Sequence, residues 1–481
     1  MTSSKPDGGP GKLVVDSIHG DIHLREREVQ VIDTASFQRL RHLKQLAMSQ
    51  MVYPNATHTR FAHSLGAFAI MARILDTAKK TGQIALSAKQ EEDLRLAALL
   101  HDVGHYPYSH LMERIDKVKL TEEYIEGAEG EERPLDRSGA PYPEHDLVGT
   151  FIVTKQSDLI EALGGKKRAK VIANLFGPKR PTTDEKAAQL SKLVHGSLDM
   201  DRLDYLLRDS QGTGVPYGHV DINYLLNNME VSTSGMVGIS EKALPAVEQF
   251  LLGRFFMHRA VYYHKTTYGM EEVCRQLLRR LRDQGCYEIP RDGEEIRKRV
   301  TTEQLWTFTD AYVDQIVQKA VNDGNQVIQT LAKSIQERRP AKLLLEVNVL
   351  MSKDDPNKHH AGTAFKVWCW HNLRALADQS AIPLGQFILC ETPPLRLEKR
   401  GPLLIAEEAK ERDWEEEEEL IKVFIANEEE PKSLVDIPYS LISKCANLFF
   451  QSFRLYVVYE GSDKEDVIGQ LKRKVGDWDK S

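Results

Sequence analysis

Four potential metal ligands follow one another along the chain: His63, the adjacent pair His101 and Asp102, and Asp201. Three of them lie in strongly helical sequence, so that helices could hold them in fixed positions. Together they offer two imidazoles and two carboxylates to one cation. Such mixed ligation without thiolates suits Fe, Mn, Zn, Ni or Co and does not select among them. A cation held in this way activates water and screens phosphate charge, so the pattern indicates hydrolytic phosphate chemistry.

His101 and Asp102 stand where a helix becomes fully apolar. Residues 91–100 change from charged to apolar with helical spacing, and the helix breaker Gly104 follows. Two ionisable side chains are therefore expected at the buried end of this helix. Because burying them without partners would be costly, we expect them to be ligated or hydrogen-bonded.

The other two ligands are less distinctive when taken singly. His63 lies in a stretch where apolar residues recur every three or four positions, and a lone histidine there is more often a core residue than a ligand. Asp201 belongs to an acid-rich stretch in which Asp199 and Asp204 are equally well explained as a solvated face. The metal site is therefore predicted from the joint pattern.

The composition restricts the class of protein. The 64 basic and 71 acidic residues give a net charge of −7, which excludes a global attraction to nucleic acid but leaves room for a local basic groove. The polar residues 1–11 do not resemble a signal peptide, and no apolar run is long enough to cross a membrane. Five scattered cysteines fit a reducing compartment: Cys274, Cys286, Cys369, Cys390 and Cys445. We expect a cytoplasmic protein with a disordered tail at 1–11.

Helical periodicity prevails up to about residue 337. Helices are predicted at 34–48, 60–80, 88–101, 144–154, 157–163, 168–175, 185–194, 199–209, 221–227, 241–282, 292–299 and 302–337. The polar segment 113–143 is expected to be an exposed insertion or loop.

After Pro340 the pattern changes. Short β-branched or aromatic runs predict strands at 343–349, 386–390, 421–426 and 453–459, with helices near 362–378 and 465–474. The acidic run 415–419 is expected to be solvated. The predicted fold is mainly α, with a helical core at 12–340 followed by a smaller α+β domain at 341–481.

Several stretches resemble the HD-domain phosphohydrolases. They are residues 12–46, Tyr53 and Pro54 with residues 57–66, residues 101–110 and residues 199–209. The nearest resemblance is to the deoxynucleoside triphosphate (dNTP) triphosphohydrolases. It implies an HD-domain helical core in which the four ligands above hold Fe, Mn or Zn, while Mg can accompany the nucleotide.

Three histidines are candidates for proton transfer, because histidine titrates near neutral pH and a leaving nucleoside oxygen must take up a proton. His105 and His110 follow the metal pair in a segment broken by Gly and Pro. In the resembling enzymes the positions of His110 and His145 lie beside the α-phosphate, and that of His105 completes the polar cluster. Glu113 stands where these enzymes have an aspartate that supports the histidine.

The resemblance also assigns residues to the substrate. Arginine suits a triphosphate through its planar fork of donors. Phosphate-contacting positions are occupied by Arg60, Arg202, Tyr205 and Arg254. Positions that hold the sugar 3′-hydroxyl are occupied by Gln45 and Asp209. Tyr262 occupies the position of a tyrosine that packs on the sugar edge, which implies that a 2′-hydroxyl is excluded.

The implied reaction is hydrolysis of a dNTP to its nucleoside and inorganic triphosphate by water attack at the α-phosphorus. In the resembling enzymes a nucleotide activator such as GTP or dGTP binds at subunit contacts and drives tetramer formation. Its recognition positions are matched by Lys12, Asp33, Gln38 and Arg41, whereas Val15 replaces a polar residue. We therefore expect a homo-oligomer, either a tetramer or a dimer.

Two other functions would use the same residues. An HD-type phosphodiesterase or nucleotide phosphatase needs the same metal ligands, because this scaffold accepts many phosphate substrates. A nucleotide-sensing or single-strand-binding module would use the metal structurally. The arginines and histidines around the ligands argue against the second alternative, since structural metal sites are closed.

Overall fold

The computed structural model describes residues 11–80, 86–117, 120–123, 140–178, 194, 196, 198–232, 237–285, 287–352, 360–397, 420–426, 428, 430–476 and 478. Predictions for the tail up to residue 10, for the helix at 185–194 apart from Val194, and for the acidic run at 415–419 lie outside these residues, as does Cys286.

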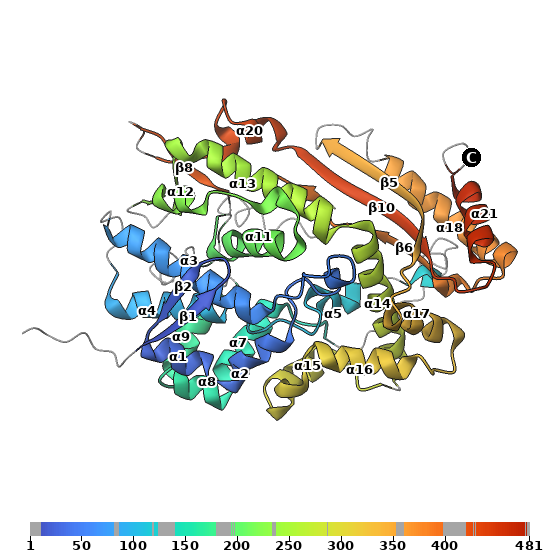
Figure 1. Cartoon of the computed structure of the whole chain (residues 1–481), viewed down its shortest axis with the longest axis horizontal. Helices are drawn as coiled ribbons and strands as arrows, with labels where there is room; N and C mark the ends of the chain where they lie inside the picture. The colour runs from blue at the N-terminus through green and yellow to red at the C-terminus, as the bar shows by residue number, and fades with distance from the viewer. Residues whose placement is uncertain are drawn as a thin grey trace, which may run out of the picture.

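The first part of the chain is mainly helical (Figure 1). The long helices are α3 (Arg60–Lys80), α4 (Ala88–Leu100), α11 (Met200–Thr213), α13 (Leu244–Met257) and α14 (Lys265–Gln284). Shorter helices are α1 (Glu26–Ile32), α2 (Ala35–Gln38), α5 (His110–Glu113), α7 (His145–Lys155), α8 (Ser157–Ala162), α9 (Lys166–Phe176), α12 (Ile222–Asn227), α15 (Gly293–Val300), α16 (Asp310–Ala320) and α17 (Gln326–Gln336). Most of the predicted helices are therefore confirmed, with ends that differ by a few residues.

Three predicted helices are interrupted. The segment 34–48 leaves the helical conformation after a 3-10 turn at Arg39–His42, because Lys44 forms a β-bridge with Thr59. The segment 241–282 contains a π-helix at His258–Tyr262 between α13 and α14. The segment 302–337 divides into a 3-10 helix at Glu303–Thr307, α16 and α17. Apolar periodicity continues across such breaks when the same face stays buried, so it does not reveal them.

Two small β elements in the helical part were not predicted. Strands β1 (Lys12–Asp16) and β2 (Gly20–Leu24) form an antiparallel hairpin. Strands β3 (Met229–Val231) and β4 (Val237–Ser240) form a second antiparallel pair. Both pairs consist of strands of five residues or fewer, whose alternation is too short to stand out from helical sequence.

The later part of the chain forms an antiparallel sheet in the order β5 (Lys342–Ser352), β10 (Leu448–Val457) and β6 (Phe387–Glu391), with β7 (Leu395–Arg396) also paired to β10. Helices α18 (His360–Ser380) and α21 (Lys464–Val475) pack against it. Their shared core includes Phe365, Leu455 and Ile468. The mainly α fold with a smaller α+β part is thus confirmed.

The two parts of the chain share secondary structure. Strand β8 (Lys422–Phe424), which lies between β7 and β10 in the chain, pairs in parallel with β4 and is itself paired with β9 (Lys432–Ser433). The following helix α20 (Leu441–Cys445) lies close to α13 in Figure 1, and Glu248 of α13 accepts hydrogen bonds from Ser440 and Leu441. Helix α14 connects the helical side of the molecule to the sheet.

The prediction that the segment 113–143 is exposed is wrong for the described residues at its two ends. Ile115, Thr121 and Tyr142 are buried, and the Tyr142 hydroxyl donates a hydrogen bond to the carbonyl of Pro290. Apolar and aromatic side chains scattered among the charged residues anchor these ends to the core. Among the helices of the described residues, none has the length and apolar character needed to cross a membrane.

Candidate active site

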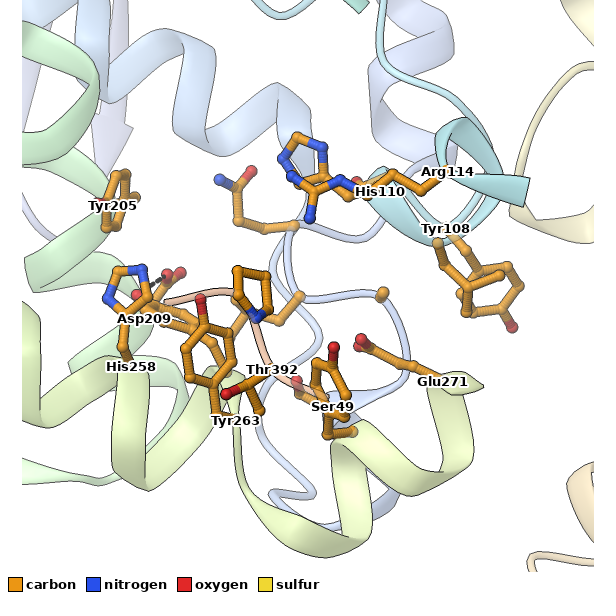
Figure 2. A pocket seen from close by; sticks show the side chains of 18 of the residues that line it. Ser49, Tyr108, His110, Arg114, Tyr205, Asp209, His258, Tyr263, Glu271 and Thr392 are labelled. Carbon is orange, nitrogen blue, oxygen red and sulfur yellow. Dashed lines mark hydrogen bonds between the residues drawn. The ribbon is translucent and has the colours of Figure 1, made fainter. Parts of the chain in front are cut away.

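A cavity of about 1010 Å³ lies between the helical part and the end of the C-terminal sheet. Figure 2 shows Asp209 and His258 on one side, Glu271 and Tyr108 on the other, and His110 near the top of the view. The walls come from the loop after α4, from α11, from the π-helix and α14, and from β6 and β10. Segments far apart in the sequence therefore enclose one volume of the size that ligand sites have.

The four predicted metal ligands converge at the wall of this cavity. Nε2 of His63 lies 2.9 Å from Oδ1 of Asp201 and 3.6 Å from Oδ2 of Asp102. Nε2 of His101 lies 3.4 Å from Oδ1 of Asp102 and 3.8 Å from Oδ1 of Asp201. His63 comes from α3, His101 from the end of α4 and Asp201 from α11, and α3 packs against both other helices.

These residues fit a divalent cation. Within the described part of the chain, Nε2 of His63 and Nε2 of His101 are buried and make no hydrogen bond of good geometry. Their Nδ1 atoms are held by Asp204 and by the carbonyl of Ala98, each at 2.8 Å, so both rings direct Nε2 to the same point. Burial lowers the pKa of His63, but the carboxylates of Asp201 and Asp204 outweigh burial and raise it to about 10. Strong negative potential therefore surrounds the point where a cation would be bound.

Arg60 and His105 hold the carboxylate of Asp102 from the other side. Nη1 of Arg60 donates to Oδ2 of Asp102 over 2.7 Å, and Nε2 of His105 lies 3.1 Å from Oδ1. Burial alone would raise the pKa of Asp102, but Arg60 and His105 outweigh it and keep the pKa well below its usual value. Arg60 also donates to Oγ of Ser109, and Ser109 has a φ of 53°, a strained conformation for a residue other than glycine.

Glu113 links two of the predicted proton-transfer residues. Its carboxylate lies 2.5 Å from Nδ1 of His110 and 3.0 Å from Nδ1 of His145. Burial lowers the pKa of His145, but the bond to Glu113 and the charge of Asp146 raise it to about 9. Burial lowers the pKa of His110, and the same carboxylate only partly opposes this effect.

The third histidine of the cluster lies against His145. The ring of His105 stacks on that of His145 with centroids 4.1 Å apart. Gly104 permits this arrangement, because a Cβ there would collide with the carbonyl of His145 and the amide nitrogen of Gly149. The predicted helix breaker thus lets the start of α7 approach the metal ligands.

Two of the residues assigned to the sugar, Tyr262 and Asp209, are hydrogen-bonded to each other. Tyr262 Oη donates to Oδ2 of Asp209 over 2.7 Å, and Oδ1 of Asp209 lies 2.8 Å from Nε2 of His58. Tyr205 meets Tyr262 edge to face with centroids 6.3 Å apart. Gln45 lines the cavity, and its buried Oε1 has no hydrogen-bond partner among the described residues. The π-helix turns Tyr262 towards α11, and π-helices are frequent at functional sites.

The remaining predicted arginines differ in position. Arg202 lines the cavity, and its Nη1 lies 3.1 Å from Oδ2 of Asp199. Arg254 is not among the described residues that line the cavity; its Nη2 donates to the carbonyl of Leu397 over 2.7 Å. The structure therefore brings Arg202 to the cavity and uses Arg254 to hold the segment after β7.

The residues assigned to an activator lie outside the cavity and form two pairs. Nζ of Lys12 lies 3.0 Å from Oδ2 of Asp33, and both side chains are exposed. Nε of Arg41 donates to Oε1 of Gln38 over 2.7 Å. All four belong to the hairpin or to the helices and turns that follow it in the chain.

Some residues at the site were not predicted from the sequence. Asp204, for which a solvated face was an equal explanation, is fully buried against His63, and Asp199 is buried as the N-cap of α11. His19 contacts Asp204, and His58 contacts Asp209. His58 could have been predicted as a site residue, because it lies within the segment 57–66 that carries the family resemblance.

The later part of the chain closes the cavity at the end formed by α14. Thr392 and Glu271 line it there, together with Tyr263 (Figure 2). The hydroxyl of Tyr268 in α14 donates to the carbonyl of Glu391 over 2.8 Å. Burial raises the pKa of Glu271 to about 7 against the opposing charge of Arg275. The C-terminal sheet is therefore part of the site and not a separate appendage.

Comparison with known proteins gives two matching family models. Residues 60–209 match the HD domain, and residues 220–347 match the HD associated region. The uncharacterized protein MJ1154 of Methanocaldococcus jannaschii is 36% identical over 258 residues, which cover 53% of this chain and 46% of that protein. The deoxynucleoside triphosphate triphosphohydrolase SAMHD1 of Homo sapiens is 27% identical over 264 residues, which cover 53% and 42%. The chain thus spans about half the length of the curated relatives it matches.

The fold is also that of a solved structure. A phosphohydrolase from Bacteroides thetaiotaomicron shares it with a TM-score of 0.64 at 22% identity, over 93% of this chain and 99% of that one. Fold, ligand geometry and family model together define an HD-domain protein. Residues 60–209 of the chain are an HD domain, and the chain resembles the HD-domain phosphohydrolases, among them the dNTP triphosphohydrolases.

Proposed function

We propose that this protein is a metal-dependent dNTP triphosphohydrolase, which converts a dNTP and water to a nucleoside and inorganic triphosphate. The observation that carries the proposal is the convergence of His63, His101, Asp102 and Asp201 beside the pair of histidines held by Glu113. A bound divalent cation can activate water and screen phosphate charge, and a proton donor can protonate the leaving oxygen.

The four ligands would hold the metal, and Fe, Mn, Zn, Ni and Co all suit them. When bound, such a cation supplies Lewis acidity towards water and phosphate oxygens. Arg60 and Arg202 line the same cavity and would bind the phosphate oxygens, because guanidinium groups match them in geometry and charge. Mg could accompany the nucleotide.

The proposed step transfers one proton to the leaving group. A water oxygen forms a bond to the α-phosphorus and releases one proton to solvent, from which the donor histidine is later reprotonated. The bond between this phosphorus and the 5′-oxygen of the sugar breaks. The nucleoside leaves with a proton on that oxygen. His110 and His145 are suited to donate it, because Glu113 orients both rings and the raised pKa of His145 keeps it protonated at neutral pH. His105 is suited to support this pair, since it stacks on His145.

Selection of the deoxyribose rests on Tyr262. Its hydroxyl binds Asp209, so its ring is held at a fixed place beside Tyr205. A sugar whose 3′-hydroxyl is bound by Asp209 and Gln45 would bring its 2′-carbon against this ring, and a 2′-hydroxyl would collide with it.

We further propose that GTP or dGTP activates the enzyme and promotes assembly of a tetramer or dimer. The activator would bind near Lys12, Asp33, Gln38 and Arg41. These residues offer cationic, anionic and amide groups, which are suited to bind the phosphates and the base of a guanine nucleotide.

The experiment that tests the function is product identification. Purified protein is incubated with Mn²⁺ and each of the four dNTPs or NTPs, and the products are separated by chromatography. Formation of triphosphate and nucleoside from dNTPs but not from NTPs would support the proposal. The Asp102→Ala variant should form neither product. Pyrophosphate or orthophosphate would instead identify a phosphodiesterase or nucleotide phosphatase. Binding of single-stranded DNA without hydrolysis would identify a nucleic-acid-binding module.

A further inference from the structure

The turn of the β1–β2 hairpin reaches the metal ligand His63 through buried side chains. Nδ1 of His63 lies 2.8 Å from Oδ2 of Asp204, and the other oxygen, Oδ1, lies 2.6 Å from Nε2 of His19 in the turn. The side chains of His63 and Asp204 are fully buried, and that of His19 is 5% exposed. A carboxylate in the protein interior therefore bridges a hairpin residue and a metal ligand.

Arg208 of α11 also binds the carboxylate of Asp204 and connects it, through Asp16, to the same turn. Its Nε and Nη2 donate to the two oxygens of Asp204, each over 2.8 Å. Its Nη1 and Nη2 also donate to the two oxygens of Asp16, over 2.9 and 3.1 Å. Asp16 in turn accepts the backbone N–H groups of Ile18 and His19 over 2.9 and 3.0 Å. Both routes from Asp204 therefore end in the hairpin turn.

The neighbouring helix is shaped to receive this group. Gly66 of α3 faces it, and a Cβ at that position would collide with Oδ1 of Asp204 and Nη2 of Arg208. Glycine at position 66 is thus required by the close approach of the Asp204–Arg208 pair to the helix that carries His63.

We propose that His19 and Asp16 are positioning residues for the metal ligand His63. The contact of Nδ1 with Asp204 fixes the orientation of the ring, so that Nε2 faces the point where a cation would be bound. His19 and the Asp16–Arg208 pair hold Asp204 in the orientation that this requires. The hairpin is therefore part of the metal centre, although neither residue reaches the cavity. The inference rests on the metal centre of the proposed function and does not depend on the substrate.

The test is the affinity of the metal-free, full-length protein for Mn²⁺, measured by equilibrium dialysis and electron paramagnetic resonance. We expect His19→Ala to weaken Mn²⁺ binding about 10- to 100-fold, the usual effect of removing a group that orients a metal ligand. His19→Gln, which keeps an N–H donor for Asp204, should recover part of the loss. His23→Ala is the matched control, because His23 is exposed on β2 of the same hairpin.

Thermal unfolding of the metal-free variants separates a role in positioning from one in stability alone. A purely structural role would lower the melting temperature while the folded protein kept its Mn²⁺ affinity, and that result would overturn the inference. If His19→Ala does not fold, the isosteric Asp16→Asn serves instead, because it weakens the ion pair with Arg208, with the same expected loss and the same refutation.

The same measurement on Asp201→Ala distinguishes failure of the inference from failure of the metal centre. Loss of Mn²⁺ from Asp201→Ala but not from His19→Ala would refute the positioning role alone. Equal Mn²⁺ binding by the parent protein and Asp201→Ala would refute the metal centre, and the positioning role with it.

Discussion

The hydroxyl of Tyr262 donates a 2.7 Å hydrogen bond to Oδ2 of Asp209, and this bond joins the π-helix to α11 across one side of the cavity. His58 holds the other oxygen of the same carboxylate. Burial and the charge of Asp209 raise the pKa of Tyr262 well above its usual value, so the hydroxyl keeps its proton and remains a donor. The position of the aromatic ring is therefore fixed before any substrate binds.

Replacing Tyr262 should separate the effect of its ring from that of its hydroxyl. Tyr262→Phe removes a hydrogen bond to a charged group, worth about 1.5–3 kcal/mol, so kcat/KM for a dNTP should fall about tenfold or more. The ring remains, and NTPs should still be rejected. Tyr262→Ala should in addition raise the ratio of kcat/KM for ATP to that for dATP. The exposed Tyr217 offers a control, Tyr217→Ala. An unchanged ATP-to-dATP ratio in Tyr262→Ala would contradict steric selection.

The pH dependence of turnover should report the bond between Glu113 and His145. The raised pKa of His145, about 9, depends on this carboxylate, so Glu113→Gln should lower it. A proton donor loses activity as the pH rises through its pKa. The alkaline limb of the pH–rate profile should therefore move to lower pH in Glu113→Gln and stay in place in Glu144→Gln, whose side chain is exposed. Superposable alkaline limbs would show that His145 is not the donor.

Glu271 should make stability depend on pH in a defined direction. Its pKa is about 7 in the folded protein, against 4.5 as the ordinary value for glutamate. The folded state thus binds the proton more tightly, and the stability that this carboxyl contributes below pH 4.5 is lost as the pH rises to about 7. Glutamine stays neutral, so the stability of Glu271→Gln relative to the parent should increase over this interval and then level off.

Urea unfolding at a series of pH values measures this difference. Glu303→Gln serves as the control, because Glu303 is exposed. Parallel stability curves for Glu271→Gln and the parent would mean that the carboxyl ionises normally in the folded protein.

Addition of GTP or dGTP should raise both the molar mass in solution and the rate of hydrolysis. The Lys12→Ala and Arg41→Ala variants should lose both responses while binding Mn²⁺ like the parent, since neither residue contacts a metal ligand. Light scattering coupled to size-exclusion chromatography gives the mass. If the molar mass and the rate of hydrolysis stay constant at saturating GTP or dGTP, the protein is not activated by these nucleotides.

The sequence predicted the elements that carry strong local signals. The helices around His63, His101 and Asp201 have clear apolar periodicity, and a burial penalty required partners for His101 and Asp102. The interruption at Lys44 was not predictable, because its cause is pairing with Thr59, a tertiary interaction. The burial of Asp204 depends on His19, which lies far away in the chain, so the local charge pattern suggested a solvated face instead.

The sequence also did not predict that the C-terminal sheet forms a wall of the cavity, because this too depends on tertiary contacts. Glu391 is the last residue of the short strand β6, and Thr392 follows it. Neither residue belongs to a sequence motif that indicates a site. They line the cavity because β6 pairs with β10 and because Tyr268 of α14 binds the carbonyl of Glu391. Contacts of this kind are decided by packing between distant segments, and short motifs do not encode them.

The most direct test of the proposed chemistry follows the oxygen atom of the attacking water. Hydrolysis of a dNTP is carried out with Mn²⁺ in water enriched in the heavy oxygen isotope, and the products are analysed by mass spectrometry. Attack at the α-phosphorus predicts one heavy oxygen in the inorganic triphosphate and none in the nucleoside. Heavy oxygen in the nucleoside, or its appearance in pyrophosphate or orthophosphate in place of triphosphate, would contradict the account.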